Sequence, residues 1–241
     1  MSASVSKIVL ITGANQGIGF EIAKSLSSKP GYHVLLGSRN AQRGIDAAKK
    51  LQEKGLEVEP IIIDVTSDES LATATKQVTS KFGRLDVLIN NAGICLNDEE
   101  TFSGPALRAA YHDTFAANTF GAALTTEAFV PLLSASPTPR IVFISSTTGS
   151  LANDSNFPAF LPIYRSSKSA LNMILVHYAT KYKAKGWKVN ASCPGHCGTN
   201  LNKFEGKNTP ESGAVNAVRL AMLGEDGETG TFSNSEGTIP W

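Results

Sequence analysis

The feature that most limits the fold of this chain is a group of three glycines that follows a short apolar segment near the N-terminus. Residues 7–12 (KIVLIT) are apolar and mostly branched, which is typical of a buried parallel strand. The next residues, Thr12 to Gly19, contain the glycines, and an amphipathic segment follows from Phe20 to Ser28. This order predicts a strand, a tight turn and a helix.

Each glycine of this turn has a separate expected role. Gly13 allows the tight turn, Gly17 lets the backbone approach a pyrophosphate, and Gly19 lets the helix pack closely on the strand. The helix N-terminus offers unpaired N–H groups and a partial positive charge to phosphates. The spacing is G-x3-G-x-G instead of the more familiar G-x-G-x-x-G, so a turn without a nucleotide is the alternative. The intervening residues expected to border a nucleotide are Asn15, Gln16 and Ile18.

Strand and helix patterns alternate along the rest of the chain. Such alternation predicts an α/β fold, in which a doubly wound parallel sheet (a Rossmann fold) is covered by helices on both faces. At 241 residues the chain fits one such domain, spanning residues 1–241. The further strands are expected at 32–38, 61–63, 87–90, 141–144, 188–193 and 230–233, and the further helices at 41–53, 69–81, 107–130 and 163–185. Ligands of these folds bind at the carboxyl ends of the strands.

The end of the second expected strand indicates which nucleotide binds. An NAD site usually has Asp or Glu about twenty residues after the glycine turn, where it accepts from the ribose hydroxyls. Here that place holds Gly37, Ser38 and Arg39, without a carboxylate. A guanidinium binds a 2′-phosphate through charge-assisted hydrogen bonds, so we expect NADPH (NADP+), with NADH less favoured. Arg43 lies one helical turn further on, and the alternative is that both arginines are only solvated.

A tyrosine and a lysine lie four residues apart in the expected helix 163–185. Tyr164 and Lys168 therefore share one helix face. A free phenol titrates near 10, and a neighbouring cation favours the phenolate and lowers that pKa. A tyrosine tuned in this way exchanges a proton with an alcohol or carbonyl oxygen. The alternative is a packed tyrosine beside a solvated lysine.

Together these residues resemble the short-chain dehydrogenases/reductases, and the resemblance covers essentially the whole chain. The motifs that carry it, in order, are Gly13-x3-Gly17-Ile18-Gly19, Asn90-Asn91-Ala92-Gly93, Asn118, Ser146, Tyr164-x-x-x-Lys168 and Pro194-Gly195. Within that family the chain is most similar to carbonyl-reductase-like members that use NADPH. The resemblance implies an oxidoreductase that transfers hydride between a nicotinamide cofactor and a carbonyl or alcohol group.

The resemblance also implies a catalytic set. Ser146 would hydrogen-bond the substrate oxygen, and Tyr164 would be the acid in reduction and the base in oxidation. Lys168 would lower the Tyr164 pKa and hold the nicotinamide ribose. Asn118, inside the helix 107–130, would anchor a water that links Lys168 to solvent.

Further residues are implied to contact the cofactor. Asp64 and Val65 would meet the adenine after the third strand, and Ser38 and Arg39 the adenosine ribose and its phosphate. The residues implied to line the cofactor after the fourth and sixth strands are Asn91, Ala92, Gly93, Pro194, Gly195 and Thr199.

Two departures from the family pattern affect these expectations. Eighteen positions separate Ser146 from Tyr164, more than in compact members, and the extra segment 151–162 holds Phe157, Phe160 and Leu161. We interpret it as a wall of the substrate pocket, with a plain surface loop as the alternative. Gln16 stands where some NADP(H)-using members carry a basic residue, which weakens the NADP(H) prediction.

Three loops are expected to form the substrate pocket, at residues 96–102, 147–162 and 199–209. They carry no charged cluster that clearly demands an acidic or a basic substrate, so we expect a small, largely uncharged aldehyde or ketone with apolar or aromatic bulk. The last loop is a candidate lid, with a solvated connection as the alternative. The alternative functions are a cofactor-assisted isomerase or dehydratase and an NADPH-sensing binding protein.

Composition limits the partners, metals and cellular compartments that are expected for this protein. Net charge is +1 with 18% charged residues, which predicts neither a nucleic-acid nor a membrane partner. Three cysteines, an odd number, argue against a disulfide framework, and a cytoplasmic protein is expected. Cys193, His196 and Cys197 lie close together, but zinc usually needs a second pair, so no metal is expected. Homodimers and homotetramers are common in the family, and a monomer is the alternative.

Overall fold

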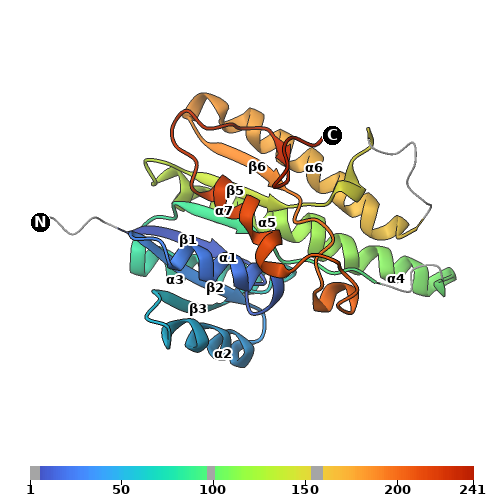
Figure 1. The fold of residues 1–241 in the computed structure, drawn as a ribbon, viewed down its shortest axis with the longest axis horizontal. Coiled ribbons are helices and arrows are strands. Elements are labelled where there is room, and N and C mark those ends of the chain that lie inside the picture. The colour runs from blue at the N-terminus through green and yellow to red at the C-terminus, as the bar shows by residue number, and fades with distance from the viewer. Residues whose placement is uncertain (1–5, 97–100, 153–159) are drawn as a thin grey trace, which may run out of the picture.

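The computed structural model describes residues 6–96, 101–152 and 160–241 and shows one seven-stranded parallel sheet (Figure 1). The strand order is β3-β2-β1-β4-β5-β6-β7, so the two halves of the sheet wind outward in opposite directions from β1 and β4. The strands are β1 (Lys7–Ile11), β2 (Tyr32–Ser38), β3 (Val58–Ile62), β4 (Val87–Asn90), β5 (Arg140–Ile144), β6 (Lys188–Ser192) and β7 (Phe232–Ser233). The predicted doubly wound fold is confirmed.

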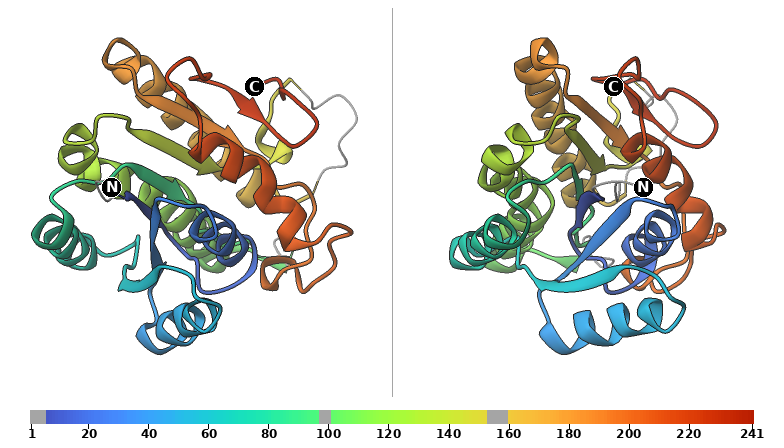
Figure 2. Two further views of the ribbon diagram at one scale, coloured as in Figure 1. Left: turned by 60° about the vertical axis from the view of Figure 1, so that its left-hand side comes forward. Right: turned by 90° about the vertical axis from the view of Figure 1, so that its left-hand side faces the viewer.

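Helices cover both faces of this sheet (Figure 2). They are α1 (Gly17–Ser27), α2 (Ala41–Gln52), α3 (Asp68–Phe82), α4 (Gly104–Phe115), α5 (Gly121–Ser134), α6 (Pro162–Tyr182) and α7 (Pro210–Ala221). Short helical turns occur at Ala116–Phe120, Thr147–Gly149, Lys183–Lys185 and Asn200–Asn202. One face packs on α1, α2 and α7, and the other packs on α3, α5 and α6.

The strand sequences explain why both faces are covered. In β1, Ile8 and Leu10 point into the core beneath α3, α5 and α6, while Val9 and Ile11 point into the core beneath α1, α2 and α7. Successive residues of a strand face opposite sides, so an apolar run without polar interruptions needs a helical layer on each side. The same alternation recurs in β4 and β5.

A buried carboxylate, Asp86, fixes the amino edge of the sheet. It is 2% exposed and lies just before β4. Its oxygens accept hydrogen bonds from the Ile8 amide at 2.8 Å, from the Ser136 hydroxyl at 2.6 Å and from Arg84 Nε at 3.1 Å. These bonds hold β1, β4 and the segment before β5 in register, at the edge opposite the one where ligands of this fold bind.

The strand expected at 61–63 is Val58–Ile62, the one expected at 230–233 is only Phe232–Ser233, and the long helix differs in form. The helix predicted at 107–130 runs from Gly104 to Ser134, but Ala116–Phe120 is a π-helical turn in which the Gly121 amide bonds to the Ala116 carbonyl. A Cβ at Gly121 would lie 2.8 Å from Val65 Cγ2, so this glycine packs directly on the loop after β3. Such π turns often occur at functional sites. In the described part of the chain, no helix is long and apolar enough to cross a membrane.

Candidate active site

The residues singled out in the sequence lie together at the carboxyl edge of the sheet. They directly follow β1, β2, β3, β4, β5 and β6, and Asn118 and α6 lie against the same edge. β1 pairs with both β2 and β4, which places the switch point of the winding beside the glycine turn. In open α/β sheets ligands bind in the crevice at this point.

The glycine turn is tied to the neighbouring strand β4. Asn91 Nδ2 donates to the carbonyl oxygens of Thr12 and Gly13, and the Asn91 and Ala92 amides both donate to Thr12 Oγ1 at 3.0 Å. A Cβ at Gly13, where φ is +62°, would lie 2.9 Å from Ala92 Cα. Gly13 is therefore required both by backbone conformation and by close approach. The Asn91 amide nitrogen supports the turn in this way.

The N-terminus of α1 has the chemistry that a phosphate requires. Its N-cap, Gln16, makes no side-chain cap, and no acidic residue lies in the first turn. In contrast, Asn40 caps α2 and Ser67 caps α3 with side-chain hydrogen bonds. Gly17 has a φ of +59°, and the nearest atoms to a Cβ placed there belong to Thr199, 3.5 Å away. Open N–H groups beside a bare backbone fit a nucleotide pyrophosphate.

The loop after β6 lies against this turn. Asn200 Nδ2 donates to Gln16 Oε1 at 2.8 Å, a contact between residues 184 positions apart. Thr199 and Asn202 form a capping box that fixes the start of the short helical turn Asn200–Asn202. Pro194, Gly195 and Thr199 thus lie in the segment that borders the glycine turn, while their roles toward the cofactor stay predictions.

The residues at the predicted adenosine end of the site differ in their exposure and in the hydrogen bonds that they already make. Ser38 is buried and its hydroxyl donates to the Asn40 carbonyl, while Arg39 and Arg43 are exposed. One oxygen of Asp64 already accepts from the Thr66 amide and hydroxyl. Arg39 and Arg43 therefore present exposed guanidinium groups at this end of the site. Val65, which follows Asp64, is buried against Gly121.

Tyr164 and Lys168 lie on one face of α6, beside the end of β5. Lys168 is 5% exposed, and its Nζ lies 5.7 Å from the centroid of the Tyr164 ring. The same Nζ donates to the Ile144 carbonyl at 2.8 Å. Burial lowers the pKa of Lys168 to about 8, and this effect exceeds the opposing influence of Cys193 and Cys95.

The Tyr164 phenol corrects one expectation. Burial raises its pKa above the ordinary value, negative charge at Cys95 or Cys193 adds to the rise, and a hydrogen bond with Ser146 partly offsets it. The expected lowering by Lys168 is therefore not seen in the chain alone, because desolvation of the phenolate dominates. The phenol stays protonated at neutral pH. The Ser146 hydroxyl also contacts Thr148 Oγ1 at 2.9 Å.

Asn118 joins the site from the π turn. Its Oδ1 accepts from the Ile94 amide at 2.8 Å, and its Nδ2 donates to the Ile94 carbonyl at 2.8 Å and to Ser167 Oγ at 3.0 Å. It connects the loop after β4 to α6, one residue before Lys168. Gly93 packs against it, since a Cβ there would lie 3.0 Å from Asn118 Oδ1. The role of Asn118 as a water anchor stays a prediction.

Parts of the expected substrate loops lie outside the described residues, namely 97–100 and 153–159, which include Phe157. Phe160 and Leu161 are half-buried, and Leu161 has a φ of +51° just before α6. Cys193 and Cys197 are buried free thiols, and Cys197 donates to the Pro194 carbonyl. Within the described ranges, no cluster of His, Cys, Asp and Glu could hold a metal ion.

Sequence reasoning did not single out three residues of α6 that support this site. Arg165, Ser169 and Asn172 bond to the segment that holds Ser146. Their spacing of four and then three residues places them on one helix face. That spacing was the one sequence signal of a shared contact surface, but polar residues on one helix face more often simply face solvent.

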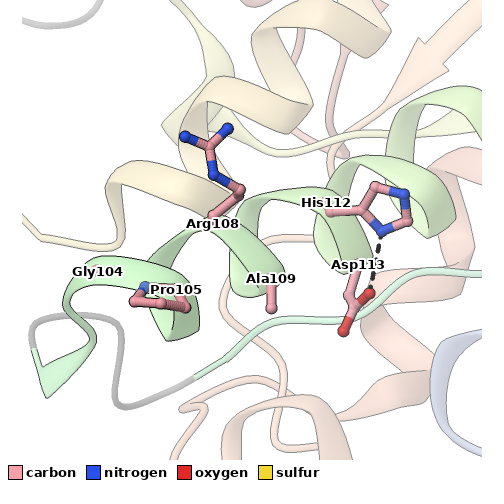
Figure 3. A pocket seen from close by; sticks show the side chains of 6 residues that line it. All are labelled: Gly104, Pro105, Arg108, Ala109, His112 and Asp113. Atoms are coloured by element: carbon pink, nitrogen blue, oxygen red, sulfur yellow. Dashed lines mark hydrogen bonds and ion pairs between the residues drawn. The ribbon is translucent and has the colours of Figure 1, made fainter.

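A separate hollow of about 690 Å³ lies along α4 (Figure 3). Its lining residues are Gly104, Pro105, Arg108, Ala109, His112 and Asp113, which come from one helix and include none of the predicted site residues. His112 Nδ1 and Asp113 Oδ1 lie 3.2 Å apart, and both side chains are exposed. This hollow therefore lacks the convergent buried groups found at the carboxyl edge of the sheet.

Comparison with known proteins agrees with this geometry. The family model described as short chain dehydrogenase matches residues 7–210. A short-chain dehydrogenase/reductase of Stachybotrys chlorohalonatus is 40% identical over 97% of this chain and 90% of its own length. The (+)-neomenthol dehydrogenase of Capsicum annuum is 30% identical over 94% of this chain and 95% of its own.

Solved structures give the same result. The NADPH-bound carbonyl reductase from chicken fatty liver superposes with a TM-score of 0.85 and 27% identity, covering 98% of this chain and 99% of that one. The fold and the site define an NAD(P)-dependent oxidoreductase. The chain belongs to the short-chain dehydrogenase/reductase family.

Proposed function

We propose that this protein reduces the carbonyl group of a small, largely uncharged aldehyde or ketone to an alcohol, reversibly, with NADPH as the cofactor. The observation that carries the proposal is the contact between the Tyr164 phenol and the Ser146 hydroxyl, with buried Lys168 beside them. Two hydroxyls that converge at the carboxyl edge of the sheet form a site for one oxygen atom of a substrate.

The protonated state of Tyr164 agrees with reduction, while its raised pKa makes the phenol a weaker acid that needs assistance from Lys168. A phenol that stays protonated at neutral pH is a proton donor, which is the form needed when a carbonyl oxygen becomes a hydroxyl. Ser146 would orient the carbonyl oxygen toward the phenol. The ammonium of Lys168 would stabilise the phenolate that remains after Tyr164 has given up its proton. In the reverse direction Tyr164 would accept the proton.

When bound, the cofactor would supply the hydride, and the protein would supply orientation and the proton. The residues that would hold it are the glycine turn Gly13–Gly19, Asn91–Gly93 and the Pro194–Thr199 segment. Arg39 would contact the 2′-phosphate, because it presents an exposed guanidinium after β2 and no carboxylate stands in its place. The relative from chicken fatty liver has NADPH bound, which agrees with this preference.

Support for the substrate class comes from described residues that are expected to border the pocket. Ser146, Cys95 and Phe160 offer hydroxyl, thiol and aromatic groups without a charged cluster. The name of the Capsicum annuum relative gives an uncharged alcohol, neomenthol, as its substrate. We therefore assign this chain an uncharged substrate with apolar bulk.

The test begins with titration of the protein with NADPH and, separately, with NADH, in which binding is monitored by protein fluorescence. NADPH oxidation is then measured with a panel of quinones, aldehydes and cyclic ketones. We expect tighter NADPH binding and turnover of at least one carbonyl compound. Tyr164→Phe removes the proton donor with little change in volume, so it should bind NADPH as the wild type does and lose turnover.

Two results would contradict the proposal. A Tyr164→Phe protein that keeps the wild-type rate would remove Tyr164 from the reaction. NADPH binding without oxidation by any carbonyl compound would instead favour a cofactor-sensing protein or a non-redox enzyme.

A further inference from the structure

A second row of side chains runs along α6 beside the catalytic pair. Arg165, Ser169 and Asn172 follow Tyr164 and Lys168 at helical spacing. All three face the segment Ser145–Ser150, which connects β5 to the expected substrate loop and contains Ser146. The row therefore lies between the element that holds the proton donor and the segment that holds Ser146.

The side chain of Asn172 bonds to residues on both sides of Ser146 in the sequence. Its Oδ1 accepts from the Ser145 hydroxyl at 2.6 Å, and its Nδ2 donates to the Gly149 carbonyl at 3.3 Å. One amide group thus bonds on both sides of Ser146. Asn172 is 6% exposed and Ser145 is 2% exposed, so water does not replace these bonds easily.

Two neighbouring side chains hold the same segment, and we call Arg165, Ser169 and Asn172 together the clamp. Ser169 Oγ donates to the same Gly149 carbonyl at 2.9 Å, and Arg165 Nε donates to the Thr148 carbonyl at 3.2 Å. A Cβ at Gly149 would lie 2.8 Å from the Cβ of Lys168. The segment is thus pressed directly on the backbone of the catalytic lysine, without room for a side chain.

The far end of the segment is held independently. Ser150 Oγ donates to the Pro240 carbonyl at 2.7 Å, and the Ala152 amide donates to the Trp241 carbonyl at 2.8 Å. Trp241 in turn stacks on Phe232 of β7. Because these contacts do not involve Asn172, its loss should shift the segment without releasing it.

We propose that Asn172 is a positioning residue that sets the placement of Ser146 relative to Tyr164. The inference rests on the proposed carbonyl reduction, in which both hydroxyls must reach one substrate oxygen. Asparagine suits the task because it both accepts and donates, whereas aspartate would lack the donor for Gly149. A displacement of about 1 Å at a catalytic group reduces rates by about 10²-fold.

The experiment compares Asn172→Ala, Ser145→Ala and the double variant with Asn190→Ala as the matched control. Asn190 is another buried asparagine that bonds two backbone groups, the Glu228 carbonyl and the Thr231 amide, but it lies within β6. We expect Asn172→Ala to lower kcat about tenfold or more with the Kd for NADPH unchanged. The double variant should lose less than the two single losses multiplied, because both act through one bond.

Hydrogen exchange of the peptide 145–152 gives a second measurement that needs no substrate. Exchange should be faster in Asn172→Ala and unchanged in Asn190→Ala. If the wild type turns over no carbonyl compound, the proposed function fails while this measurement still tests the clamp. Unchanged exchange, or a kcat loss in Asn190→Ala equal to that in Asn172→Ala, would overturn the positioning role.

Discussion

The ammonium of Lys168 lies 2.8 Å from the carbonyl oxygen of Ile144, so the end of β5 binds this buried cation directly. Burial lowers its pKa from 10.5 to about 8. Between these two values the unfolded chain holds a proton that the folded chain has released. Stability therefore rises with pH across this window, since the unfolded state binds more protons there.

The first prediction concerns the change of the free energy of unfolding with pH. In the protein without cofactor, the free energy of unfolding should increase between pH 8 and pH 10 through Lys168. Lys168→Met keeps the length of the side chain and removes the titrating group. Urea unfolding at several pH values should show a shallower slope for the variant, and identical slopes would contradict a lowered Lys168 pKa.

The second prediction concerns the adenosine end of the site. Arg39→Ala should weaken NADPH binding by about tenfold or more and change NADH binding little, because the 2′-phosphate is the group that the guanidinium contacts. Fluorescence titration with both cofactors measures the difference. The converse variant, Gln16→Lys, adds a cation at the N-cap of α1 that can attract the 2′-phosphate, and it should strengthen NADPH binding. Equal weakening of both cofactors by Arg39→Ala would rule out the phosphate contact.

Local patterns predicted much of this molecule. Residues 7–12 show a strand that is buried on both faces, and in the structure Ile8 and Val9 enter opposite cores. The glycine turn follows from backbone rules that act within a few residues. The spacing of Tyr164 and Lys168 places both on one helix face before any tertiary contact is known.

The remaining features depend on contacts between distant segments. The π turn at Ala116–Phe120 accompanies the packing of Gly121 on Val65, which no local pattern reveals. The bond between Gln16 and Asn200 joins residues 184 positions apart. The direction of the Tyr164 pKa shift depends on how far the fold removes the phenol from water, which residue spacing does not reveal.

The third prediction concerns the buried carboxylate at the opposite edge of the sheet. Asp86→Ala leaves the Ile8 amide, the Ser136 hydroxyl and Arg84 without their shared acceptor. We expect unfolding in urea to show a loss of about 3 kcal/mol. Glu59→Ala, which removes a partly exposed partner of Lys81, should lose under about 1 kcal/mol. Similar losses in both variants would contradict the structural role of Asp86.

The fourth prediction concerns Asn118, whose amide is bonded to both backbone groups of Ile94 and to Ser167. Asn118→Ala leaves the Ile94 N–H and C=O unpaired, so we expect a loss of about 1–3 kcal/mol in the free energy of unfolding. Asn90→Ala is the matched control, since that buried side chain donates a single bond, to Thr126 Oγ1, and should lose less. Because Asn118 also joins the loop after β4 to the helix of Tyr164 and Lys168, its replacement should lower kcat as well. An Asn118→Ala protein with wild-type stability would show that these bonds are readily replaced by water.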